Sequence, residues 1–159
     1  MPEKIDEVLS RVAVETFEKL AFLLAFPEDD ALGEEMGDTV SGSVVFTGPF
    51  SGILKIRISS AVLPELAANM LGLDDEAKVA LGDRHDALKE TVNVICGNLL
   101  PVIAGRKPIF NMETPVVLSE EEDQGRQALS TVRLSFDEGE CEISIYVDGE
   151  FPEEVLDVE

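Results

Sequence analysis

The residues of this chain that could do chemistry lie together in one stretch, which begins at His85 and has the pattern of an amphipathic helix. Its apolar residues recur at three- and four-residue steps and predict one buried face: Leu88, Val92, Ile95, Leu99 and Ile103. Four further residues recur at similar steps on another face, named here the polar stripe: Asp86, Glu90, Asn93 and Gly97. Asn and Gly both weaken a helix interior, Gly by roughly 0.5–1 kcal/mol relative to Ala. We therefore expect the helix to retain them for a surface that it presents.

A Glu and an Asn one turn apart on a rigid helix could assist a hydrolysis for which a second protein supplies the electrophile. The carboxamide of Asn93 can both donate and accept hydrogen bonds, so it can hold a water in line with that electrophile. The carboxylate of Glu90 can bind a lysine of the same partner. Hydrolysis of an acyl phosphate fits this pair, because phosphoryl transfer depends mainly on positioning and charge compensation. On spacing alone, however, two ordinary surface residues are the simpler interpretation in a chain with 33 acidic residues.

The length and charge of the chain bound its organisation and its partners. A length of 159 residues predicts one domain, residues 1–159. A net charge of -21 argues against nucleic acid or an anionic membrane surface as partner and favours a basic or lysine-bearing one, although most of the acids serve solubility. The longest apolar run, Leu20–Phe26, is too short to span a bilayer, and the N-terminus shows no secretory signal. We therefore expect a cytoplasmic protein.

Residue types that hold metals or act as nucleophiles are sparse. Cys96 is expected on the helix and Cys141 in a strand, and two cysteines do not make a disulfide framework. His85 is the single histidine, which leaves no cluster of metal ligands and argues against a serine-hydrolase triad. Nothing in the sequence supports a Cys–His pair, and His85 fits a surface or capping role at the start of its helix. We expect no metal site and no cofactor of the chain's own.

Periodicity and turn chemistry predict the elements that precede this helix. They are a helix over Ile5–Phe26 ended by Pro27, a hairpin with strands Ser43–Phe46 and Ile53–Ile58, a helix over Ser60–Leu71 with Pro64 in its first turn and Gly72 at its end, and an acidic loop over Leu73–Gly82. The helix with the polar stripe follows, and we expect it to kink or break near Gly97 and Pro101.

The remaining segments read mainly as strands. Thr114–Leu118 predicts a short strand, followed by a solvated loop at Ser119–Gly125. Apolar and polar residues alternate in Val132–Phe136 and again in Ile143–Val147, which predicts a second hairpin. The acidic tail from Asp148 is expected to fray.

The two halves of the chain resemble each other. Glu15–Ala25 aligns with Glu90–Leu100, and each half ends in a hairpin that turns at glycine. This pattern indicates either an internal duplication or the general likeness of amphipathic helices. If the halves are related, Glu18 stands where the second helix carries Asn93, and only the second helix keeps the carboxamide.

Five features in order extend over nearly the whole chain: a helix with Glu-Thr-Phe-Glu, a glycine-rich hairpin, a short helix ending at Met70-Leu-Gly72, the polar stripe followed by Asn98, and Thr114-Pro-Val-Val117. This ordered set resembles the CheX/CheC/FliY family of chemotaxis phosphatases, and its order and spacing are most similar to CheX. The resemblance implies a pseudo-symmetric α/β (α+β) fold, with two long helices packed over a β-sheet that is built from two hairpin-containing halves.

The resemblance also implies an activity and a partner. The expected reaction is hydrolysis of the aspartyl phosphate of a CheY-like response regulator, in chemotaxis or related two-component signalling. In that family the Glu engages the regulator's lysine and the Asn orients the attacking water; by position these residues are Glu90 and Asn93. Glu18 in place of a second Asn fits the single-site type of CheX. The partner is then a phosphorylated CheY-like receiver domain, which would itself carry any Mg²⁺.

The other two residues of the polar stripe are candidates for binding the partner, and each has a second interpretation. Asp86 matches an acidic position of the family, or it is a first-turn acid that favours the helix dipole. Gly97 leaves room either for the partner or for a packed neighbour within the chain.

The resemblance leaves an alternative function and adds an expected oligomer. The same architecture serves in flagellar switch proteins, so a non-catalytic receiver-binding adaptor or a flagellar-switch-like structural module is the alternative. An adaptor would keep Glu90 without needing Asn93, and the presence of Asn93 therefore favours the enzyme. A homodimer is expected as well, because the family pairs this way and the two apolar-faced hairpins offer sheet edges.

Overall fold

A computed structural model of the chain describes residues 4–28, 37–75, 78–118 and 127–148. Within these ranges seven strands form one antiparallel sheet, in the order β1-β6-β7-β3-β2-β4, with β5 also paired with β2. Their bounds are β1 Phe26–Glu28, β2 Thr39–Thr47, β3 Ser51–Ser59, β4 Asn111–Met112, β5 Val116–Leu118, β6 Ser130–Ser135 and β7 Glu140–Asp148. The predicted loop at Ser119–Gly125 and the predicted fraying of the tail beyond Asp148 lie outside the described residues.

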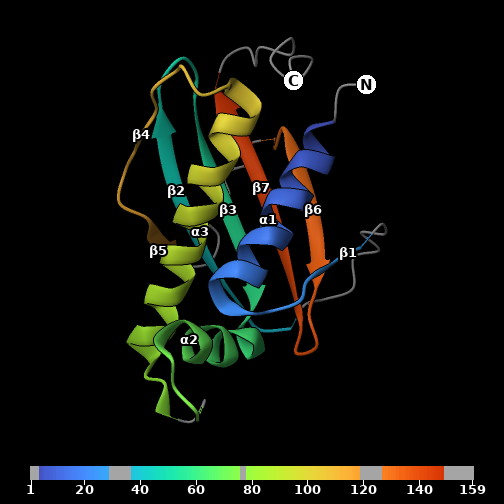
Figure 1. Cartoon of the computed structure of the whole chain (residues 1–159), viewed down its shortest axis with the longest axis vertical. Helices are drawn as coiled ribbons and strands as arrows, with labels where there is room; N and C mark the ends of the chain where they lie inside the picture. Colours follow the sequence, from blue (N-terminus) through green and yellow to red (C-terminus); the bar gives the residue numbers. More distant parts are fainter. Residues whose placement is uncertain (1–3, 29–36, 76–77, 119–126, 149–159) are drawn as a thin grey trace.

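Three α-helices cover one face of this sheet (Figure 1). They are α1 Ile5–Ala21, α2 Leu63–Leu71 and α3 Leu81–Ala104, and a 3-10 turn at Ser60–Val62 leads into α2. α3 packs on β2 and β3, α1 packs on β6, and α2 crosses below both long helices and contacts each of them. The prediction of two long helices over a sheet is therefore confirmed.

The sheet is pseudo-symmetric: exchanging β1 with β5, β2 with β6 and β3 with β7 gives the same strand order, read from the other edge. The first half contributes α1, β1, β2 and β3, and the second contributes α3, β5, β6 and β7. Their hairpins meet at the central β3–β7 pair, while β1 of the first half pairs with β6 and β5 of the second half pairs with β2. This arrangement is the pseudo-symmetric fold that the sequence predicts.

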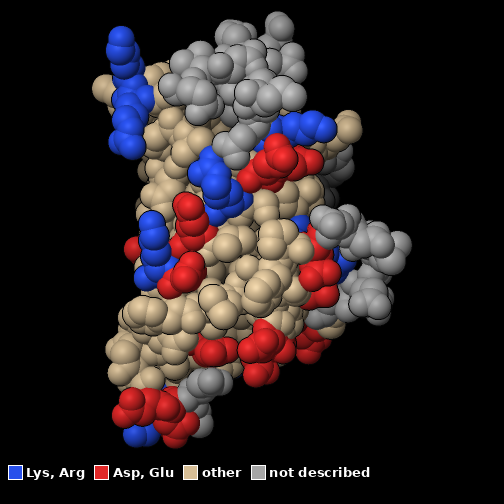
Figure 2. Space-filling view, turned by 45° about the vertical axis from the view of Figure 1, so that its right-hand side comes forward, with Lys and Arg blue, Asp and Glu red and all other residues tan. Residues whose placement is uncertain are grey.

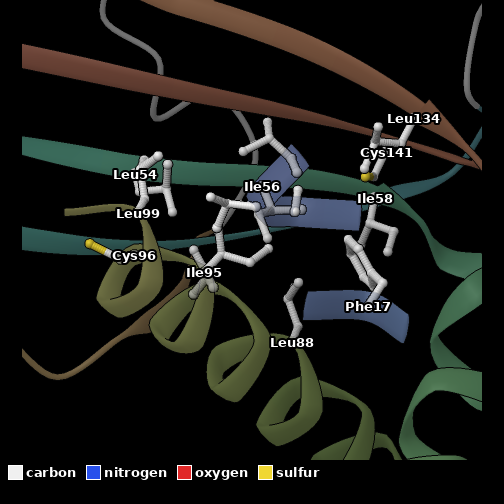
Figure 3. Close-up of a cluster of buried hydrophobic side chains, with 14 of the residues drawn as sticks. Phe17, Leu54, Ile56, Ile58, Leu88, Ile95, Cys96, Leu99, Leu134 and Cys141 are labelled. Atoms are coloured by element: carbon white, nitrogen blue, oxygen red, sulfur yellow. The ribbon is translucent and has the colours of Figure 1, made fainter. Parts of the chain in front are cut away.

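The core lies between the long helices and the central strands. Alternate residues of β3 face the helices, so Leu54, Ile56 and Ile58 are fully buried. Figure 3 shows Leu88 and Ile95 of α3 directed into this cluster. Burial of apolar surface, at about 25 cal/mol per Å², is the main force that fixes α3 on the sheet.

The first helix is shorter than the sequence predicts. α1 ends at Ala21 rather than Phe26, because Phe22 takes a left-handed conformation (φ 56°) and its N–H donates to the Glu18 carbonyl at 3.0 Å. The side-chain amide of Asn69 donates to the Ala21 carbonyl at 2.7 Å and caps the same end. The continuous apolar run misled the prediction, since such a run fits a helix and an extended segment equally.

The helix with the polar stripe is longer than predicted, and the prediction of a break was wrong. α3 begins at Leu81, inside the expected acidic loop, and continues through Gly97 and Pro101 to Ala104. Pro101 lies in the last turn and removes one backbone hydrogen bond from the helix. The residues around it, Leu99, Leu100 and Ile103, are buried, and their packing offsets that loss.

The other predicted elements are confirmed with small changes of length. β2 begins at Thr39, four residues before the predicted strand, and the short strands β1 and β4 were not predicted. α2 ends where predicted, at Gly72, whose left-handed φ of 75° suits a glycine.

One of the described helices, α3, is long and apolar enough by length and composition to cross a membrane. Half of its most apolar window is buried inside the protein, as is common for a core helix.

Gly52 on β3 permits the closest approach in the sheet, and replacing it tests the central β3–β7 pair. A Cβ atom at this position would collide with the carbonyl of Tyr146 on β7 and lie 2.8 Å from the Phe46 ring. We expect Gly52→Ala to lower the free energy of unfolding by about 3 kcal/mol or more in denaturant titrations. Gly82→Ala in the first turn of α3, where nothing lies within 4 Å, is the matched control and should be neutral or stabilising. Equal stability of the two variants would contradict this account of the sheet.

Candidate active site on helix α3

The four residues of the polar stripe lie on the face of α3 that points away from the sheet. Asp86, Glu90 and Gly97 are exposed, and Asn93 is half-buried. At 100° per residue, the four positions fall within an arc of about 60° around the helix. The structure thus brings together all four residues that the sequence singles out.

Thr91 fixes the turn of α3 that carries Glu90 and Asn93, and sequence reasoning missed it. Its side chain is fully buried, and its hydroxyl donates to the Ala87 carbonyl at 2.8 Å and lies 3.8 Å from the sulfur of Met70 on α2. The contact with α2 holds this turn against a second helix. The sequence carries no clear signal for this role, because the burial of Thr91 is seen only in the structure.

The same Glu-Thr pair recurs on α1, as the pseudo-symmetry requires. Thr16 is buried and donates to the Val12 carbonyl at 2.8 Å, while the Asn98 amide of α3 donates to the Thr16 hydroxyl at 3.4 Å. With Thr16 equivalent to Thr91, Glu18 takes the place of Asn93, and it is exposed where Asn93 is half-buried. The two helices therefore share the Glu-Thr pair, but the first half carries Arg11, Glu18 and Phe22 at the positions of Asp86, Asn93 and Gly97.

The side chains of Glu90 and Asn93 make no hydrogen bond or ion pair within the described ranges of the chain. Asp86, by contrast, lies 3.4 Å from the Lys89 ammonium, with its own side chain 75% exposed. An exposed pair of this kind contributes little to stability. Glu90 and Asn93 are thus available to a partner without breaking a contact seen here.

The structure rejects the first-turn interpretation of Asp86. Because α3 begins at Leu81, Asp86 lies in the second turn, and the first-turn acid is Asp83, which accepts the Ala80 N–H at 3.1 Å. His85 is half-buried one residue before Asp86 and is not at the helix start, so its predicted capping role is wrong as well.

Gly97 has no packed neighbour that would require a glycine. A Cβ atom placed on it would meet, among the described residues, only the sulfur of Met112, at 4.0 Å. The sequence offered two interpretations of Gly97, room for a partner and room for a packed neighbour within the chain. The structure does not support the second.

Neither cysteine is placed to act as a nucleophile. Burial raises the pKa of the Cys96 thiol to about 12, and burial is also the main cause that raises the pKa of Cys141. Both cysteines are free, and both lie in the core cluster that Figure 3 shows. Among the described residues, no group of three or more His, Cys, Asp or Glu side chains could hold a metal ion.

Solved structures similar to this chain belong to one structural class. CheX from Vibrio vulnificus matches with a TM-score of 0.73 and 21% identity, over 92% of this chain and 97% of that one. CheX from Desulfovibrio desulfuricans matches with a TM-score of 0.68 and 18% identity, over 91% of this chain and 99% of that one. A CheX–CheY–BeF3–Mg²⁺ complex from Borrelia burgdorferi matches with a TM-score of 0.64 and 17% identity, over 92% of this chain and 100% of that one. A search of curated proteins gave no match.

The fold is therefore that of the CheX-like class of chemotaxis proteins. A family model described as chemotaxis phosphatase CheX matches residues 40–137, which is more than half of the chain and includes the whole of α3. The protein belongs to the CheX family.

The raised thiol pKa values predict how stability depends on pH. The unfolded thiols ionise near pH 8.5, whereas the folded ones stay protonated, so stability is constant below that pH and falls as the pH rises above it. The expected loss is up to about 1.4 kcal/mol per pH unit for each thiol. Urea unfolding at pH 8, 9 and 10 measures it, and Cys141→Ala should give a shallower slope than the wild type. Equal slopes, or rapid thiol labelling of the folded protein at pH 8, would contradict the buried placement.

Proposed function

We propose that this protein hydrolyses the aspartyl phosphate of a CheY-like receiver domain, with Glu90 and Asn93 as the residues that act on the partner. Membership of the CheX family supports the reaction class. The observation that supports it most directly is the placement of an exposed carboxylate and a half-buried carboxamide, one turn apart, on a helix whose opposite face is buried in the core.

Each residue has one task in the proposed reaction. The Asn93 carboxamide holds a water in line with the phosphorus, and the Glu90 carboxylate binds a lysine of the receiver. The water oxygen forms a bond to phosphorus as the bond to the aspartate oxygen breaks. The aspartate leaves as a carboxylate, and both protons of the water stay on the inorganic phosphate. A half-buried position suits Asn93, because partial burial restricts its rotation before the partner arrives.

The metal in this scheme belongs to the receiver. Mg²⁺ prefers carboxylate and phosphate oxygens together, and the phosphoaspartate offers both. The Borrelia burgdorferi complex, in which CheX is joined to CheY with BeF3 and Mg²⁺, supports a partner of this kind. We also retain the expectation of a cytoplasmic location, since the protein has to meet its receiver.

The proposed roles predict three different outcomes for three alanine variants. Asn93→Ala should lower the rate of receiver dephosphorylation by about 10²-fold while folding and receiver binding persist. Glu90→Ala should also weaken binding, by about tenfold, because the contact with the lysine exists before the transition state. Glu18→Ala, at the equivalent place on α1, should leave both unchanged. Phosphate release from a phosphorylated CheY-type receiver measures the rates, with Mg²⁺ present.

The same three variants separate the enzyme from the adaptor. An adaptor would bind the receiver without speeding phosphate loss, so Asn93→Ala would change nothing. If Glu18→Ala were as damaging as Asn93→Ala, the single-site assignment would be wrong.

A homodimer also remains a proposal on the family resemblance, but the second reason for it, free edges on the two hairpins, does not hold. The two hairpins pair with each other at β3–β7, and their outer strands β2 and β6 carry β4, β5 and β1. A better candidate surface is the segment that leads into the edge strand β1, where Phe22, Leu24 and Phe26 are 77%, 63% and 54% exposed. Exposed apolar groups of this kind mark interaction sites.

Light scattering at tens of micromolar should therefore detect a dimer, since a dissociation constant of about 1 µM would suffice at that concentration. Leu24→Glu should shift the protein to the monomer, while Glu18→Ala, on the exposed face of α1, should not. A wild-type protein that is only monomeric would remove this proposal.

A further inference from the structure

Gly97 is a helix-weakening residue that the interior of the protein does not require. It lies one turn after Asn93 on the polar stripe, and the nearest described atom to a Cβ placed there is 4.0 Å away. Gly in a helix costs roughly 0.5–1 kcal/mol relative to Ala, so an Ala would fit and stabilise α3. The absence of a side chain therefore matters on the outer surface of the helix.

A hollow of about 260 Å³ opens beside this glycine, between the end of α3 and the segment that follows it. Its lining includes Gly97, Leu100, Pro101, Arg106, Phe110 and Met112. The volume is below the roughly 300–1,000 Å³ usual for small-molecule sites. It suits the side chain of a protein partner better than a metabolite.

The floor of the hollow is apolar and held in place by the sheet. The Phe110 ring makes edge-to-face contacts with Phe46 and Phe50, at centroid distances of 6.0 and 5.1 Å. Met112 belongs to β4 and pairs with Phe46 on β2. The hollow is thus formed before any partner binds, which keeps the entropy cost of binding low.

The rim of the hollow is basic, in a protein whose net charge is -21. Arg106 lines it, and Lys107 is exposed next to it. The opposite end of the stripe is acidic, with Asp86 and Glu90 exposed. Figure 2 shows the same trend over one face of the molecule, with acidic side chains gathered at the α2 end and most basic ones in the half where α3 ends.

We propose that this hollow receives an apolar side chain of the receiver domain, while Arg106 binds a carboxylate of the same partner. The proposal rests on the proposed function, which places that partner on the polar stripe that Gly97 shares. Contacts of opposite charge then orient the receiver along the polar stripe: its lysine meets Glu90, and its carboxylate meets Arg106 just after the end of α3. Complementarity of this kind contributes mainly to orientation and to the association rate.

The test uses two variants with matched controls. Gly97→Leu fills the hollow, and Gly82→Leu places the same side chain at an open position on the same helix. Arg106→Glu reverses the charge on the rim, and Lys78→Glu reverses an exposed charge that precedes α3. Binding of a CheY-type receiver loaded with beryllofluoride and Mg²⁺ is measured by titration, with thermal unfolding of each variant alongside.

We expect Gly97→Leu to weaken receiver binding at least tenfold without lowering the melting temperature, and Gly82→Leu to bind as the wild type does. Arg106→Glu should weaken binding about fivefold, reduce its salt dependence, and raise KM more than it lowers kcat. Equal affinities of Gly97→Leu and Gly82→Leu, or of Arg106→Glu and Lys78→Glu, would overturn the inference.

Asn93→Ala distinguishes this failure from failure of the proposed function. If Asn93→Ala loses hydrolysis while Gly97→Leu binds normally, the enzyme stands and only the hollow is wrong. If the wild-type protein neither binds nor dephosphorylates receivers, both proposals are wrong.

Discussion

The packing of α3 against strands β2 and β3 is the contact on which the rest of this structure depends. Leu88 reaches so close to β2 that a Cβ atom on Gly42 would lie 3.0 Å from it, and Ile95 and Leu99 are fully buried below. These contacts set the rotation of the helix about its own axis. Because successive residues differ by about 100°, fixing the buried face also fixes which residues point outward. The core thereby decides that Glu90 and Asn93 share a surface.

This dependence explains why much of the fold, and the placement of the four stripe residues on one outward face of α3, could be predicted. The apolar spacing of α3 identifies its buried face from sequence, and the outward face follows by elimination. The two hairpins alternate cleanly, so their inner residues were also predictable. What was missed depends on contacts between distant segments. The end of α1 relies on Asn69, far along the chain, and no local pattern shows that Leu23 and Ala25 are buried in an extended segment.

The sequence left two interpretations open for each of Asp86 and Gly97, and the structural surroundings of each residue, rather than its type, decide between them. Asp86 could not be assigned until the first turn of α3 was located, and Gly97 could not be assigned without knowing what lies above it. Thr91 is a residue whose structural role the sequence did not indicate at all. A Thr in a helix is unremarkable in sequence, yet here its hydroxyl bonds the preceding turn and its side chain meets α2 beneath the stripe.

The interleaving of the two halves has a consequence for how the chain reaches this structure. The second neighbour of β3 is β7, where Ser51 pairs with Asp148, and the neighbour of β1 is β6. Both partners come late in the sequence. Neither half has a complete sheet of its own, so a ribosome-bound chain that ends before β6 carries an open strand edge and an uncovered apolar layer. Long-range pairings of this type slow folding, because loop closure costs entropy before the contacts form. The interleaved strand order therefore means that the sheet is complete only once the last strand, β7, has been made.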